Sequence, residues 1–295
     1  MITVMGATGH TGKRITELLL QAGEPVRALG RSASTLAARA RAGAQVRAGD
    51  PTDAAFLTAA FRDADAVYTL LPFDMQTPDY HAAQQAQGEA IVQAVRASGV
   101  RHVVALSSVG ADQPAGTGPI ASLHAQEARL RQIEGANLLI LRAGAFFENF
   151  YGALGLIKQQ GINGDAVAPD VAIPMIATRD IADAAAKALM AHDWHGVVVR
   201  ELLGPRDLSY AEATRILGQR IGRPDLEYVQ FSYSDLAGAL QQAGFSANLA
   251  SLYAELAQAI NERRVRSLEG RKPENATATR FEDFVEELAC AYRAI

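Results

Sequence analysis

The feature that most constrains this sequence is a glycine-rich turn close to its amino terminus. After a short apolar run, Ile2 to Val4, the chain reads Gly6-Ala7-Thr8-Gly9-His10-Thr11-Gly12 and continues with a helical pattern. Glycines allow a tight turn and a close approach of the backbone to a bound group. A helix that begins there offers free N–H groups and partial positive charge to an anion. The context therefore predicts a phosphate-binding turn in a βαβ unit, with a glycine-rich turn that binds no ligand as the alternative.

The spacing within this turn excludes another phosphate-binding motif. A Walker A loop has four residues between its first glycine and a Gly-Lys pair, and Ser or Thr follows that pair. Here five residues separate Gly6 from Gly12-Lys13, and Arg14 follows. Both differences argue against an ATPase, so a dinucleotide is the expected ligand.

The first half of the chain repeats the same alternation of strands and helices. The expected strands are short, almost wholly apolar and bounded by Gly, Pro, Asp or Ser: Ile2–Val4, Val26–Leu29, Val46–Ala48, Ala66–Leu70, Val103–Leu106 and Leu138–Leu141. Such runs are typical of strands that helices cover on both faces. We therefore predict an α/β fold, a Rossmann-type doubly wound parallel sheet, followed by a smaller, mainly helical C-terminal substrate domain.

The second half of the chain has a different pattern. Glycines and prolines between residues 152 and 174 predict loops, and helical patterns follow at 179–191, 209–221, 234–243, 247–261 and 280–293. We expect residues 1–150 to form the nucleotide-binding domain and residues 151–295 the substrate-binding domain. Residues 170–200, which include the apolar run Val197–Val199, are candidates to rejoin the first domain.

Composition limits the classes of function. The chain has 28 basic and 32 acidic residues, so nucleic acid is not expected as its main partner. The single cysteine, Cys290, cannot form an internal disulfide, which fits a reducing compartment. Neither a membrane span nor a signal peptide is recognisable. We expect a cytoplasmic protein with a small-molecule substrate; a homodimer is expected only because it is the commonest oligomer.

The end of the second expected strand indicates which dinucleotide binds. NAD sites usually place Asp or Glu there, about 20 residues beyond the glycines, on the ribose 2′-hydroxyl. This chain has Arg31 and Ser32 instead, and Arg31 stands 19 residues after Gly12. A guanidinium binds a 2′-phosphate through charge-assisted hydrogen bonds, and Ser32 can add one while capping the next helix. We predict NADP(H) in preference to NAD(H), with a solvated arginine in a turn as the alternative.

Three further segments follow expected strands, where ligands bind in open α/β sheets. Asp50 could flank the adenine, and Leu71-Pro72-Phe73 could lie beside the ribose and adenine. Ser107 follows the fifth strand, near the expected nicotinamide. Each of these segments also has an ordinary explanation as a loop or a helix cap.

With these residues in view, the chain resembles the NmrA-like family, atypical members of the short-chain dehydrogenase/reductase superfamily. The resemblance rests on the glycine turn, Arg31, Gly49-Asp50, Ser107-Ser108 and the stretch Leu139 to Asn149, which is similar to the family's TILRPGxFxEN segment. It implies a Rossmann domain, a small C-terminal substrate domain and NADP(H) in the cleft between them. The family contains quinone reductases, triphenylmethane reductases, isoflavone reductase-like enzymes and NADP-sensing regulators.

The Tyr-x-x-x-Lys pair of the superfamily is absent. None of the four lysines has a tyrosine four positions before it, and the corresponding helix reads His124-Ala125-Gln126-Glu127-Ala128. The ordinary alcohol or ketone mechanism, in which the tyrosine protonates the substrate oxygen, is therefore not expected. Hydride addition to a quinone or a cationic dye gives a stabilised product and needs little acid catalysis, so orientation can supply much of the rate.

Several residues are candidates for the catalytic and substrate site. His124 is the first candidate for a proton donor or substrate contact because histidine titrates near neutral pH, and Ser107 and Asn149 are the other polar candidates. A surface histidine is the alternative for His124, and core packing is the alternative for the phenylalanines. Aromatic side chains that could stack on a flat acceptor are Phe146, Phe147, Tyr151 and, with lower rank, Tyr80.

No metal site is expected, because His192 and His195 have no cysteine nearby and only Asp193 between them, and they fit a surface pair at a helix end. The sequence thus predicts an NADP(H)-dependent oxidoreductase that transfers hydride to a small conjugated acceptor: a quinone, azo or dye-like compound. The alternative is a non-catalytic NADP(H)-sensing regulatory protein.

Overall fold

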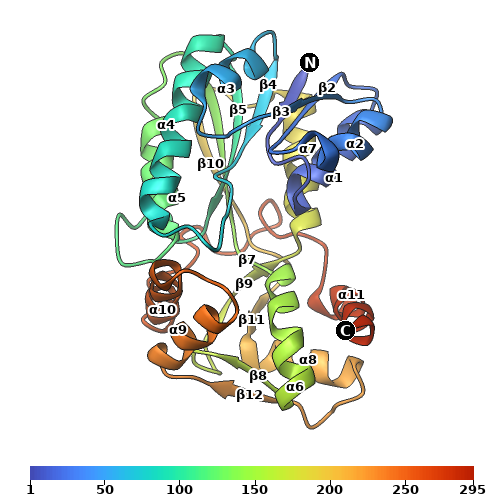
Figure 1. The fold of residues 1–295 in the computed structure, drawn as a ribbon, viewed down its shortest axis with the longest axis vertical. Coiled ribbons are helices and arrows are strands. Elements are labelled where there is room, and N and C mark those ends of the chain that lie inside the picture. Colours follow the sequence, from blue (N-terminus) through green and yellow to red (C-terminus); the bar gives the residue numbers. More distant parts are fainter.

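The computed structural model describes residues 1–295, which form two parts arranged along the long axis of the molecule (Figure 1). Seven strands of the upper part form one sheet: β1 (Ile2–Val4), β2 (Val26–Gly30), β3 (Gln45–Ala48), β4 (Ala66–Thr69), β5 (His102–Ser108), β6 (Asn137–Ala143) and β10 (Val197–Leu202). All neighbouring pairs in this sheet are parallel. The predicted doubly wound parallel sheet is therefore confirmed.

The strand order is β10-β6-β5-β4-β1-β2-β3. From β1 the chain proceeds outward to β2 and β3 on one side, and it then returns to β4, β5 and β6 on the other. The direction reverses between β1 and β4, and at such a point a crevice opens outside the carboxyl ends of the strands. The apolar run Val197–Val199 lies in β10 and pairs with β6, so this later segment extends the large sheet.

Helices cover both faces of the sheet. The helices of the upper part are α1 (His10–Gln21), α2 (Ala33–Arg41), α3 (Ala54–Phe61), α4 (Tyr80–Ser98), α5 (Ile120–Leu130) and α7 (Thr178–Ala191). Residues of α1, α2 and α7 share one buried cluster with the sheet, and residues of α3, α4 and α5 share another. Nearly continuous apolar strands are stable here because both of their faces are removed from water.

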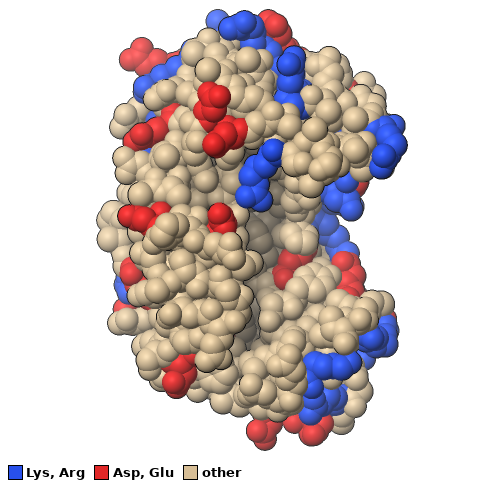
Figure 2. Space-filling view, viewed as in Figure 1, with Lys and Arg blue, Asp and Glu red and all other residues tan.

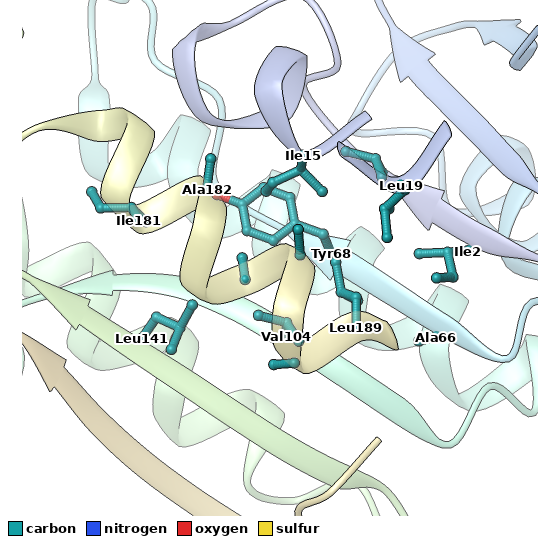
Figure 3. Packing of buried hydrophobic residues seen from close by; sticks show 14 of the residues in the cluster. Ile2, Ile15, Leu19, Ala66, Tyr68, Val104, Leu141, Ile181, Ala182 and Leu189 are labelled. Carbon is teal, nitrogen blue, oxygen red and sulfur yellow. The ribbon is translucent and has the colours of Figure 1, made fainter. Parts of the chain in front are cut away.

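Tyr68 of β4 connects the core to the glycine turn. Its ring is fully buried, and Figure 3 shows it between Ile15 of α1 and Ala182 of α7. Its hydroxyl donates a hydrogen bond of 3.0 Å to Thr11 Oγ1, in the first turn of α1. A buried tyrosine needs such a partner, so this bond fixes the beginning of α1 relative to β4.

The lower part has its own core and more strands than expected. It contains a 3₁₀ segment (Phe147–Ala153), α6 (Leu154–Gln160), α8 (Tyr210–Arg220), α9 (Tyr233–Gln242), α10 (Ala247–Asn261), α11 (Phe281–Ala294), β7 (Ala145–Phe146), β8 (Ile162–Asp165), β9 (Ala172–Ile176), β11 (Asp207–Ser209) and β12 (Glu227–Gln230). The prediction of loops for residues 152–174 was wrong, because this stretch contains α6, β8 and most of β9. These elements are too short to show a clear hydrophobic period, and pairing with β12, β7 and β11 stabilises the strands.

Hydrogen bonds join the parts at several places, and two of these places lie at the start of α7 and at the start of α4. Near the amino end of α7, Glu148 accepts bonds from the backbone N–H (3.0 Å) and hydroxyl (2.5 Å) of Thr178. Across the molecule, the backbone N–H of Ser246 donates to the carbonyl of Met75 (2.8 Å), and that of Tyr80 to Asn248 Oδ1 (2.9 Å). The crevice therefore lies between two parts that are fixed to one another at separate places. None of the helices combines the length and apolar character that crossing a membrane requires.

A histidine pair lies at the amino end of β5. The ring of His102 stacks on His192 with 4.7 Å between ring centroids, and Trp194 lies edge-on to His102 at 5.2 Å. Burial, and next the charge of His192, lower the pKa of His102. A hydrogen bond from the imidazole to the backbone of Asp65 opposes this shift, and His195 adds a smaller lowering effect. Charging this imidazole is therefore less favourable in the folded state than in the unfolded chain.

We expect stability to fall as pH drops below about 6.5, because the unfolded chain then binds a proton that folded His102 still resists. His102→Gln should unfold with a smaller loss of stability between pH 7.5 and 5.5 than the unchanged protein. Urea unfolding at the two pH values measures this, with the exposed His10→Gln as control. Equal pH dependence in His102→Gln and the unchanged protein would contradict the role of His102.

Candidate functional site

The crevice opens at the carboxyl ends of the central strands. β6 leads through Gly144 into β7 and the 3₁₀ segment, so these ends face the lower part (Figure 1). The space-filling view shows a hollow at this level, between the upper and lower parts (Figure 2). This is the position at which open α/β sheets bind ligands.

The glycine turn has the geometry of a phosphate-binding turn. Gly6 has a φ of +63°, which favours glycine, and its carbonyl accepts a 2.9 Å bond from the N–H of Gly9. A Cβ on Gly12 would lie 2.3 Å from the Gly6 carbonyl oxygen, so only glycine fits there. Gly9 caps α1 without a side-chain hydrogen bond, and the first turn of α1 has no acidic residue. The N–H groups in the first turn of α1 are thus free to bind an anion.

The other residues of the turn have different environments. Thr8 and His10 are exposed. Thr11 is buried and accepts the hydrogen bond from Tyr68. Its hydroxyl is therefore used within the fold, while its backbone N–H remains part of the free first turn.

A second helix begins beside the expected position of the 2′-phosphate. Arg31 is exposed directly after β2 and forms no hydrogen bond or ion pair within the chain. Ser32 is the N-cap residue of α2, but its side chain does not cap that helix; its hydroxyl is 2.7 Å from that of Ser34. The prediction that Ser32 caps the next helix is therefore confirmed for its position, but its side chain makes no capping hydrogen bond. Because of this, the first N–H groups of α2 remain available next to the guanidinium.

The segments after β3 and β4 differ in their hydrogen bonds and in their exposure to solvent. Asp50 accepts bonds from the N–H (2.8 Å) and hydroxyl (2.7 Å) of Thr52, and these bonds lower the pKa of its carboxyl. Leu71 and Pro72 are half-buried. Phe73 is 45% exposed, and its ring centroid lies 6.2 Å from that of Phe245 in the lower part. This segment thus reaches from the carboxyl end of β4 to the opposite wall.

Ser107 belongs to a buried charged network that the sequence did not reveal. Its hydroxyl donates a 2.7 Å bond to Glu127 Oε1 of α5. Arg142 of β6 binds the same carboxylate through Nε (2.9 Å) and Nη2 (2.7 Å). Ser107 and Arg142 are register partners in the parallel sheet, so the tertiary structure brings the three side chains together. The sequence holds a weak signal, since Glu127 and Arg142 are charges within otherwise apolar patterns.

The other two predicted catalytic residues are accessible to different extents. His124 is half-buried, and its Nδ1 lies 2.9 Å from the carbonyl oxygen of Ala111. Since a carbonyl only accepts, Nδ1 carries the proton, and Nε2 is an acceptor while the ring is neutral. Asn149 is exposed in the 3₁₀ segment and has no hydrogen bond within the chain.

The structure separates the predicted aromatic residues. Phe147 is fully buried between Phe281 (5.1 Å between centroids) and Phe284 (5.5 Å). Its prediction as a substrate contact was therefore wrong, because its ring forms the core of the lower part. Phe146 and Tyr151 are half-exposed, and burial raises the pKa of the Tyr151 hydroxyl.

Tyr80 is buried beneath Phe73, and this burial raises the pKa of its hydroxyl, which stays neutral at physiological pH. It contributes to the wall behind Phe73 more than to any exposed surface. No group of three or more His, Cys, Asp or Glu side chains in the chain is arranged to hold a metal ion.

Comparison with known proteins gives consistent relationships. The model of the NmrA-like family matches residues 1–286. The chain is 30% identical over 226 residues (76% of this chain and 75% of the relative) to (4-alkanoyl-5-oxo-2,5-dihydrofuran-3-yl)methyl phosphate reductase of Streptomyces griseus.

Many solved structures share the fold, and the following two are among them. The NADPH-dependent quinone oxidoreductase of Escherichia coli complexed with NADPH superposes with a TM-score of 0.84 at 24% identity, covering 98% of this chain and 99% of the other. The triphenylmethane reductase of Citrobacter sp. complexed with NADP(H) gives 0.82 at 20% identity, with 98% and 100% covered.

Two glycine substitutions should separate the folding role of the turn from its binding role. Gly12→Ala places a methyl group against the Gly6 carbonyl and should destabilise the protein by about 1–3 kcal/mol. Gly9→Ala meets only an ordinary 3.5 Å contact. It should cost less than about 1 kcal/mol but weaken NADPH binding at least about tenfold, because the backbone can no longer approach the phosphates. Thermal unfolding and calorimetric titration measure both, and full NADPH affinity in Gly9→Ala would contradict this placement of the phosphates.

Proposed function

The chain belongs to the NmrA-like family, and from this premise we propose that it is an NADP(H)-dependent oxidoreductase that transfers hydride to a small conjugated acceptor such as a quinone, an azo compound or a dye-like cation. One observation carries the proposal above the others. A phosphate-binding turn at the switch point of the sheet is combined with an unpartnered guanidinium, Arg31, at the end of β2. Together they provide two anion sites in the order that a phosphorylated dinucleotide requires.

The residues present fit this cofactor. The free N–H groups at the start of α1 would bind the pyrophosphate, and Arg31 with the uncapped start of α2 would bind the 2′-phosphate. The nicotinamide half of the cofactor would then extend over the ends of β4 and β5. Two of the solved structures with the same fold were obtained with NADPH or NADP(H), which supports this assignment.

The chemistry of the walls favours acceptors that need little acid catalysis. NADPH would supply a hydride. A neutral acceptor such as a quinone or an azo compound would then gain one proton, from solvent or from a side chain, whereas a cationic dye becomes neutral and needs none. The chain has no tyrosine four positions before a lysine that could act as the acid. Tyr80 is buried, and its raised pKa makes its hydroxyl a poor proton donor. A stabilised product such as a hydroquinone anion avoids this need.

His124 and Asn149 are the proposed polar contacts for the acceptor, and Phe146, Tyr151 and Phe73 the proposed aromatic ones. A flat acceptor can stack on such rings and be held for transfer. The named substrate of the Streptomyces relative is an unsaturated lactone with a second carbonyl group, which is also an electron-poor conjugated acceptor.

The preference for the phosphorylated cofactor depends on Arg31. NADPH should bind at least about tenfold more tightly than NADH, and Arg31→Ala should remove most of this difference, because a charge-assisted bidentate contact is lost. Arg41→Ala removes the same charge from the exposed end of α2 and should leave the ratio unchanged. Calorimetric titration of each variant with both nucleotides measures this, and equal affinities in the unchanged protein would refute the assignment.

The acceptor class is tested by NADPH oxidation with a panel of quinones, azo compounds and triphenylmethane dyes. At least one class should give acceptor-dependent oxidation, and simple ketones should give none, because the chain has no Tyr-x-x-x-Lys pair to protonate the alkoxide that a ketone forms. If the protein binds NADPH and NADP⁺ with clearly different affinities but none of the acceptors in the panel causes NADPH oxidation, it is a sensor and the proposal fails.

A further inference from the structure

The hydroxyl of Ser107 is held in one orientation by its surroundings. Ser107 is 5% exposed and Glu127 4% exposed, and the side chain of Arg142 is 11% exposed. The guanidinium binds both oxygens of the carboxylate, at 2.9 and 2.7 Å, and Ser107 donates to Oε1 at 2.7 Å. All three of these hydrogen bonds are accepted by the carboxylate of Glu127. A second cation, Arg131, approaches Glu127 Oε2 at 3.4 Å from the partly exposed side.

The charges of this network determine the direction of the Ser107 bond. A guanidinium is always protonated, and the pKa of Arg142 is raised further by its hydrogen bonds to Glu127. A carboxylate in a bidentate pair with it is ionised, and an ionised carboxylate only accepts hydrogen bonds. The single proton of the Ser107 hydroxyl therefore points toward Glu127. What remains on Oγ is lone pairs, so Ser107 can accept a further hydrogen bond but cannot donate one.

The strand order indicates which part of a bound dinucleotide would meet Ser107. Arg31 and Asp50 follow β2 and β3, on one side of the glycine turn, and mark the side of the adenosine. β4 and β5 lie on the other side of β1 in the sheet, so the nicotinamide half extends over them. Ser107 is the next-to-last residue of β5. The donor that the nicotinamide ring carries is the NH₂ of its carboxamide.

We propose that Ser107 accepts a hydrogen bond from the carboxamide NH₂ of the nicotinamide, and that Glu127 and Arg142 are positioning residues that keep it an acceptor. This inference rests on the proposed cofactor and assigns a role to three residues beyond it. Ser107 thereby orients the nicotinamide ring and is not a proton donor to the acceptor. The network selects for a cofactor with a donor on that substituent.

Nucleotide analogues test the direction of this bond without any acceptor present. Thionicotinamide NADP⁺ keeps the NH₂ group, whereas 3-acetylpyridine NADP⁺ has a methyl group in its place. The unchanged protein should bind NADP⁺ and the thionicotinamide analogue with similar affinity and the acetylpyridine analogue about five- to tenfold more weakly. Ser107→Ala should weaken binding of the first two by about this factor and leave the third unchanged, so that all three affinities become similar.

Two further variants distinguish this role from a structural one. Glu127→Gln places an amide that can donate or accept beside Ser107, which frees the hydroxyl to reverse. The acetyl group of the acetylpyridine analogue can then turn its carbonyl oxygen toward Ser107 and accept a bond from the reversed hydroxyl. Glu127→Gln should therefore tighten binding of this analogue and reduce the discrimination against it. Ser108→Ala is the matched control, because the Ser108 hydroxyl donates 2.9 Å to the carbonyl of Val109 and takes no part in the network. Its affinity ratios should equal those of the unchanged protein.

The outcomes separate this inference from the proposed function. If the unchanged protein binds none of the three nucleotides, the proposed cofactor is wrong. If it binds them but does not discriminate against the acetylpyridine analogue, or if folded Ser107→Ala keeps the discrimination, the role of Ser107 is refuted while the cofactor stands. Thermal unfolding of each variant confirms that the affinities refer to folded protein.

Discussion

The close approach of Gly12 to the carbonyl of Gly6 is the contact on which the rest of the site depends. A side chain at position 12 would lie 2.3 Å from that oxygen, so α1 can begin directly above the end of β1 only with glycine there. The hydrogen bond from buried Tyr68 to Thr11 then fixes this beginning to β4, the strand on the other side of the switch point. One turn thus sets both the crevice and the free N–H groups that face it.

The buried pair of Glu127 and Arg142 has a comparable role at the other end of the site. Removing two charges from water is unfavourable, and leaving one of them unpaired costs about 3–5 kcal/mol, so each partner requires the other. Glu127 lies on α5, the helix on which the resemblance to short-chain dehydrogenases would have suggested the Tyr-x-x-x-Lys pair. An acid–base pair is replaced by a fixed, fully ionised one. This replacement suits orientation of a cofactor better than proton transfer, which agrees with acceptors that need little acid catalysis.

The connection between the two parts explains why a cleft persists between two separate cores. Glu148 supplies the cap that Ala177, at the N-cap position of α7, cannot provide. On the other edge, the backbone of Met75 receives a bond from Ser246, and Phe73 lies against Phe245. The segment after β4, which the sequence predicts to lie beside the cofactor, therefore also contacts the lower part of the molecule. Any change in how far the parts open must alter these contacts.

The sequence by itself determined the features that depend on neighbouring residues. Apolar runs and the glycine turn were sufficient for the strand–helix alternation and the doubly wound sheet, because both follow from local periodicity and backbone freedom. Tertiary structure decided whatever depends on register and on side chains distant in the chain. Ser107 meets Glu127 and Arg142 only because β5 and β6 pair in one register under α5, and Phe147 is buried only because α11 returns to cover it. Short strands such as β8 and β12 likewise form only by pairing with each other, because neither segment has enough hydrophobic periodicity to specify a strand alone.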